Sequence, residues 1–132
     1  AMLPFTLDTV RLSLHILAVC IWIGGQLVVA AAVPVLREVG SDAPRLVARR
    51  FGQVAWPAFG LAVLTGIWSI LTLPSGQSFE YNVTLGVKLL LVVGSGVAAF
   101  VHQQTSSPTL RGATGGLGLM SGLGALVLGV ML

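Results

Sequence analysis

The segment Val83–Val101 reads VTLGVKLLLVVGSGVAAFV, and it is long and apolar enough to cross a bilayer except for one charge, at Lys88. An ammonium group inside hydrocarbon costs about 2.5–3.5 kcal/mol on insertion scales. Such groups usually face the interior of a helix bundle or a cavity. Lys88 is therefore the first candidate for a functional residue.

The composition of the whole chain is that of an integral membrane protein. Its 132 residues are 55% hydrophobic and 8% charged, whereas a soluble domain carries about 25% charged residues. Seven Lys and Arg and four Asp and Glu cannot cover a water-facing surface of this size. We therefore expect one all-α domain over residues 1–132, with the lipid bilayer as its main partner.

Four apolar segments predict a four-helix transmembrane bundle. Each approaches the ~20 residues that a helix needs to span the hydrocarbon. The segments run from about residue 12 to 36, 51 to 73, 83 to 102 and 115 to 132.

The fourth segment also carries a stripe of small residues, namely Gly115, Gly118, Gly122, Ala125 and Gly129. Such stripes allow close helix packing, and here they predict contact inside the bundle or across a homodimer.

The distribution of Lys and Arg predicts how the chain is oriented. The connection Arg37–Arg50 contains four arginines, whereas Pro74–Asn82 contains none. Because positive charge favours the cytoplasmic side, we expect Arg37–Arg50 inside and both chain ends outside, in the bacterial inner membrane. Arg11 is a single charge against this orientation. The net charge of +3 indicates membrane topology rather than nucleic-acid binding.

Polar residues of the first segment share one helical face. At 100° per residue, His15, Trp22 and Gln26 fall within about 40° of one another. His15 and Lys88 both lie roughly 5–9 Å below the expected outer interface. We therefore predict a polar pocket that contains both residues.

The second segment adds secondary candidates for the lining of this pocket, since its outer half contains Thr65, Trp68 and Ser69. His102 lies about 21 Å beyond Lys88 along the third helix. We therefore expect His102 near the cytoplasmic surface, where it cannot share a metal with His15.

Two interpretations remain open for each central residue. His15 is either an ordinary hydrogen-bonded histidine or a ligand of copper or haem, through its neutral imidazole. Lys88 is either a residue that snorkels to the interface or a functional group. In the second case it binds a haem propionate, supplies an axial nitrogen once deprotonated, or relays protons.

The segment Leu14–Gly25, LHILAVCIWIGG, resembles the opening helix of the copper-resistance protein D (CopD-like) membrane family. Arg50 with Phe51, Gly66, and Lys88 in LGVKLLLV continue the resemblance, which covers about residues 12–104. The placement of His15 and Lys88 is also similar to the HemJ-type protoporphyrinogen oxidases, which bind haem b. These resemblances imply a metal-handling or haem-binding membrane protein.

Three functional hypotheses follow. The chain binds copper or haem b in its intramembrane pocket, for metal handling or electron transfer. Alternatively, it is a haem-dependent oxidase of a tetrapyrrole, in which the haem carries the electrons. In the third hypothesis it is a structural or regulatory membrane subunit without a cofactor. No sequence motif assigns a catalytic residue.

Overall fold

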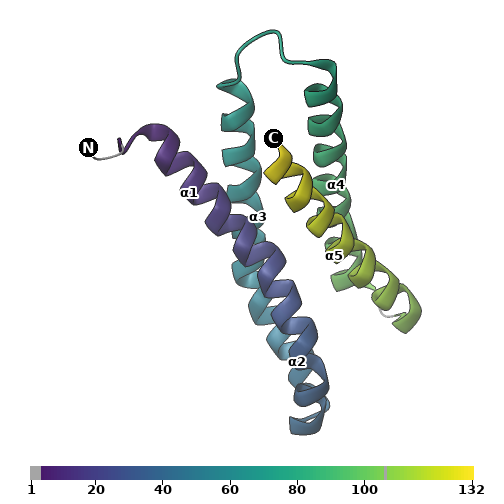
Figure 1. The fold of residues 1–132 in the computed structure, drawn as a ribbon. Helices are drawn as coiled ribbons and strands as arrows, with labels where there is room; N and C mark the ends of the chain where they lie inside the picture. Colours follow the sequence, from purple (N-terminus) through teal and green to yellow (C-terminus); the bar gives the residue numbers. More distant parts are fainter. Residues whose placement is uncertain (1–3, 106) are drawn as a thin grey trace. The chain divides into compact units, whose positions relative to one another are not determined.

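The computed structural model describes residues 4–105 and 107–132, in which the regular structure is helical and no strand occurs (Figure 1). The chain divides into two compact units, Ala1–Leu73 (unit 1) and Pro74–Leu132 (unit 2). Each unit is a hairpin of long helices. The expected all-α class is confirmed.

Four helical runs have the length and composition to cross a membrane, as predicted: Leu7–Val39, Ala43–Leu71, Phe79–Gln104 and Thr109–Met131. The first begins five residues before the predicted start at residue 12. The last begins six residues before the predicted start at residue 115. The predictions followed the apolar stretches alone, whereas the helices continue through polar turns at the membrane surface.

Unit 1 begins with a helix of 33 residues that contains a π-helical turn. It consists of α1 (Leu7–Val19), the π turn η1 (Cys20–Gly24) and α2 (Gly25–Val39). A capping box starts α1, in which Thr6 Oγ1 accepts from the Thr9 amide at 3.4 Å and Thr9 Oγ1 accepts from the Thr6 amide at 3.2 Å. These bonds satisfy amides that a helix start leaves without partners.

The second helix of unit 1, α3 (Ala43–Leu71), returns along α2 and α1 (Figure 1). The Phe51 ring of α3 packs against Gly25, where a Cβ atom would overlap it. Next to this contact, Trp22 packs on Trp56 and Phe59, with ring centroids 5.1 and 4.5 Å away. Glycine and aromatic residues therefore set the spacing of this hairpin.

Unit 2 consists of α4 (Phe79–Gln104) and α5 (Pro108–Met131). Several glycines of α5 face α4. A Cβ atom at Gly118 would lie 3.3 Å from the Ala98 Cβ, and one at Gly115 would lie 3.2 Å from the His102 ring. The buried Ser95 hydroxyl donates to the Gly118 carbonyl at 3.1 Å. The glycine stripe thus packs inside unit 2. Contact inside the bundle was one of its two predicted uses, and contact across a homodimer was the other.

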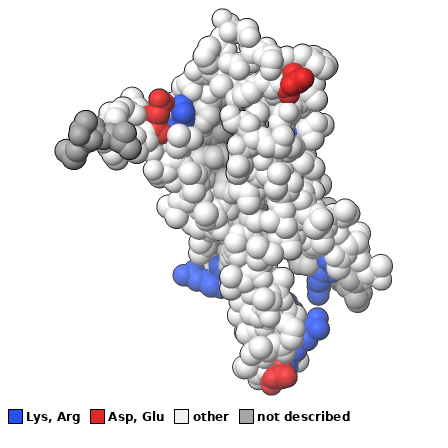
Figure 2. Space-filling model, viewed as in Figure 1, with Lys and Arg blue, Asp and Glu red and all other residues white. Residues whose placement is uncertain are grey.

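Charged side chains gather near the helix ends (Figure 2). The arginines of the α2–α3 connection are exposed, and Arg45 pairs with Asp42 at 3.6 Å. Arg111 occupies the start of α5 and donates to the Thr105 carbonyl at 3.0 Å. Lys88 is the exception, since it lies ten residues into α4.

Candidate functional site

His15 lies on the side of α1 that packs against α3. Its Nδ1 atom is 3.1 Å from the carbonyl oxygen of Ala62 and 2.8 Å from Thr65 Oγ1. A carbonyl oxygen can only accept a hydrogen bond. A hydrogen bond to Ala62 puts the proton on Nδ1, and in that tautomer of the neutral ring the lone pair lies on Nε2.

The Thr65 hydroxyl is well placed to accept from His15, because its own proton is directed elsewhere. Thr65 Oγ1 donates to the carbonyls of Leu61 at 2.8 Å and Ala62 at 3.1 Å, and the residue is 3% exposed. A histidine that ligates a metal through one nitrogen usually donates its other N–H to a carbonyl or carboxylate in this way. The ring orientation and tautomer of His15 are thus set by α3.

Small residues of α3 make room for the imidazole. A Cβ atom at Gly66 would lie 3.6 Å from His15 Cε1, an ordinary contact distance. Ala62 and Thr65 complete this surface. The imidazole consequently rests against the helix without a bulky neighbour at these three positions.

Arg11 lies one helical turn before His15 on the same side of α1. Its Nη1 atom donates to Thr72 Oγ1 at 2.8 Å and pairs with Asp8 Oδ1 at 3.1 Å, and its side chain is 11% exposed. Composition and charge predict for Arg11 only an effect on membrane orientation. The i, i+4 spacing of Arg11 and His15 was the signal that could have grouped them.

The π turn changes the predicted face of the first helix. Residues in such a turn rotate by less than 100° each, because the hydrogen bonds run from i to i+5. The constant angle that grouped His15, Trp22 and Gln26 therefore does not apply across Cys20–Gly24. Trp22 packs in the aromatic cluster with Trp56 and Phe59, and Gln26 is half-buried.

The two other candidates on α3 behave differently from Thr65. Ser69 donates to the Thr65 carbonyl of its own helix at 3.0 Å. Trp68 is 37% exposed. Of the three secondary candidates on α3, Thr65 is the one with a hydrogen bond to His15.

Lys88 occupies unit 2, where its side chain crosses α5 at Gly129. A Cβ atom at Gly129 would lie 3.1 Å from Lys88 Nζ. Within residues 4–105 and 107–132, no hydrogen bond or ion pair of this ammonium is found. Because His15 and Lys88 belong to separate units, their pairing stays a prediction.

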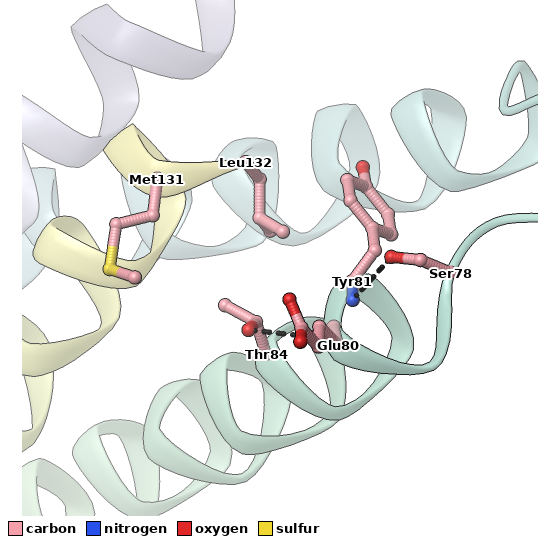
Figure 3. A pocket seen from close by; sticks show the side chains of 6 residues that line it. All are labelled: Ser78, Glu80, Tyr81, Thr84, Met131 and Leu132. Atoms are coloured by element: carbon pink, nitrogen blue, oxygen red, sulfur yellow. Dashed lines mark hydrogen bonds between the residues drawn. The ribbon is translucent and has the colours of Figure 1, made fainter.

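An open pocket of about 260 Å³ lies between the start of α4 and the end of α5 (Figure 3). Figure 3 shows polar side chains of α4 on one side and Met131 and Leu132 on the other. Thr84 lies one turn before Lys88 and donates to the Glu80 carbonyl at 2.8 Å. The full lining is Ser78, Glu80, Tyr81, Thr84, Met131 and Leu132.

His102 is bound at the other end of unit 2. Its Nδ1 atom donates to the Arg111 carbonyl at 2.7 Å, next to the connection between α4 and α5. Its ring also contacts the backbone of α5 at Gly115. This arrangement gives His102 a structural role at the helix end.

The described part of the chain brings together no group of three or more His, Cys, Asp or Glu side chains that could hold a metal ion. Cys20 is a free, exposed thiol. His15 is thus the one predicted ligand that the structure orients through its second nitrogen.

Comparison of the chain with family models, curated proteins and solved structures gave no match.

Proposed function

We propose that this integral membrane protein binds haem b, with Nε2 of His15 as an axial ligand of the iron. The observation that carries the proposal is the bond from His15 Nδ1 to the Ala62 carbonyl at 3.1 Å. It places the lone pair on Nε2 and fixes the ring plane before any ligand arrives.

The donor set favours haem over a bare copper ion. A protein site for a metal ion needs several side chains that converge, and the described residues supply no such group around His15. Haem brings its own porphyrin nitrogens, so a single histidine can hold its iron. The number of available ligands therefore supports haem, rather than copper, as the cofactor in this proposal.

Bound haem would supply one-electron chemistry, and the residues of unit 1 would adjust it. The bond from Nδ1 to the Ala62 carbonyl raises the basicity of the ligating nitrogen, and Thr65 limits rotation of the ring. The aromatic cluster of Trp22, Trp56 and Phe59 gives this part of the hairpin a stiff, apolar core. These roles fit electron transfer in a membrane.

The CopD-like and HemJ-type resemblances belong to this proposal, since they include His15 and imply a metal-handling or haem-binding membrane protein. We further propose the bacterial inner membrane, with both chain ends outside, because the exposed arginines gather at the α2–α3 connection. A homodimer through α5 would use the side away from α4, where Leu117 and Met120 are exposed.

The proposal is tested by purifying the full chain in mild detergent and recording visible spectra after titration with haem. The wild type and the control His102→Ala should show a saturable Soret band, whereas His15→Ala should not bind. Metal analysis of the same samples tests the copper alternative. Copper bound through His15 without a Soret band, or equal haem binding by His15→Ala, would overturn the proposal.

A separate assay addresses the oxidase hypothesis. Haem-loaded protein is mixed with protoporphyrinogen and dioxygen as the electron acceptor, and the fluorescence of the porphyrin product is compared with a protein-free sample. Turnover lost in His15→Ala but kept in His102→Ala would add catalysis to haem binding. Binding without turnover leaves an electron-transfer or haem-handling protein.

A further inference from the structure

The contacts of Arg11 with Thr72 and Asp8 use one nitrogen of its guanidinium group. Nη1 contacts both Thr72 at 2.8 Å and Asp8 at 3.1 Å. Nε is buried and has no hydrogen-bond partner among the described residues, and Arg11 is the one described residue with such an atom. A buried donor of a charged group that is left unsatisfied is costly, so it needs an explanation.

The unsatisfied atom lies on the edge of the guanidinium that binds anions most strongly. The N–H groups of Nε and Nη2 point in the same direction and match the two oxygens of a carboxylate. The contacts with Thr72 and Asp8 both use Nη1. The structure thus holds Arg11 by one nitrogen, and its buried Nε–H has no partner among the described residues.

The position of Arg11 relates this edge to His15. Four residues correspond to about 6 Å along a helix and bring the two side chains to the same face. His15 bonds to Thr65 of α3, and Arg11 bonds to Thr72, the residue that caps the C-terminal end of α3. One cation and one imidazole therefore lie in successive turns of the same helix–helix contact.

We propose that the Nε–Nη2 edge of Arg11 binds a carboxylate of the ligand held at His15, which for haem b is a propionate. This inference rests on the proposed function and gives Arg11 the role that the sequence had suggested for Lys88. It also accounts for an arginine at the opposite end of the unit 1 hairpin from the arginines of the α2–α3 connection.

The test compares haem with its dimethyl ester, in which both carboxylates are blocked. Both are titrated into wild type, Arg11→Gln, Arg11→Lys and the control Arg49→Gln, an exposed arginine of α3. Wild type should bind haem about tenfold or more tightly than the ester, because a charge-assisted pair is lost in the ester. Arg11→Gln should remove this preference, Arg11→Lys should reduce it because the charge stays while the paired N–H edge is lost, and Arg49→Gln should keep it.

The outcomes separate this inference from the haem proposal. If wild type binds neither form, the proposed function itself fails. If wild type binds both forms equally, or if either Arg11 variant keeps the full preference of wild type, the Arg11 inference is overturned while haem binding stands. The wild-type comparison remains decisive even if a variant does not fold.

A lipid phosphate could present the same anionic chemistry to Arg11. The titrations are therefore repeated in nanodiscs that contain phosphatidylglycerol and in nanodiscs that contain only phosphatidylcholine. The proposed carboxylate contact predicts the same preference for haem over its ester in both. Loss of the preference with phosphatidylglycerol alone would assign the edge to a lipid phosphate and overturn the inference.

Discussion

The Nδ1 atom of His15 on α1 lies 3.1 Å from the carbonyl oxygen of Ala62 on α3. Carbonyls inside a helix normally accept from the amide four residues later. Here the Ala62 carbonyl also accepts from a side chain of the facing helix. The contact connects the packing of α1 on α3 with the tautomer of His15. A substitution that changes this packing should therefore also change the tautomer, and the reverse.

Replacement of Thr65 by Val should weaken this link. The substitution removes the hydroxyl that lies 2.8 Å from His15 Nδ1 and keeps the shape of the side chain. We expect a loss of about 1 kcal/mol in stability and roughly 10–100-fold weaker haem binding. Thermal unfolding and haem titration in detergent measure the two effects.

Thr84→Val is the matched control for that substitution, because among the described residues Thr84 bonds to its own helix alone, at the Glu80 carbonyl. The control should leave haem affinity unchanged. Equal haem affinity in Thr65→Val and wild type would show that Thr65 does not position the ligand.

Gly25→Ala should destabilise unit 1, because its Cβ atom would overlap the Phe51 ring. Overpacking of this kind costs about 1–3 kcal/mol. Gly24→Ala is the neighbouring control, since nothing lies within 4 Å of a Cβ atom there. The melting temperature should fall for Gly25→Ala alone, and adding Phe51→Leu should recover part of the loss. Equal melting temperatures for the two glycine variants would contradict this packing.

Gly118→Leu should disrupt the hairpin of unit 2. A Cβ atom at Gly118 already lies 3.3 Å from the Ala98 Cβ, and the rest of a leucine would push α5 away from α4. We expect a loss of about 1–3 kcal/mol, read from thermal unfolding. Gly116→Leu, with nothing within 4 Å of its Cβ position, should have little effect. A similar loss in both variants would argue against α5 packing through Gly118.

Lys88→Met should make the protein more stable. The described residues provide no hydrogen bond or ion pair for the Lys88 ammonium, so its removal relieves a desolvation cost without breaking a bond. The gain should be about 1 kcal/mol, below the 2.5–3.5 kcal/mol of a charge at the bilayer centre. Leu89→Met serves as the control. A clear decrease in melting temperature would reveal a stabilising partner of Lys88.

Membrane orientation can be measured with one cysteine in the α3–α4 connection and one in the α4–α5 connection. In a Cys20→Ala background, Ser75→Cys and Thr105→Cys are exposed to a membrane-impermeant thiol reagent in intact cells. The positive-inside rule predicts labelling at position 75 and protection at position 105. Labelling at position 105 alone would reverse the orientation, although His15 and Thr65 would still face each other within unit 1.

The sequence by itself determined the features that depend on composition. An apolar stretch of about 20 residues cannot leave its backbone unsatisfied in lipid, so it must be helical. This constraint on the backbone predicted the four spans and the all-α class. The small residues of the fourth span predicted its close packing. His15 was selected for the same reason, since polar groups are rare inside a span.

Only the tertiary structure decided which side chains meet across a helix pair. The π turn at Cys20–Gly24 changes the rotation of the first helix, so a face computed at 100° per residue fails beyond it. The contacts of Arg11 with Thr72 and of His15 with Ala62 join residues 61 and 47 positions apart. Such pairs depend on how two helices are offset and rotated against each other, and packing sets both quantities.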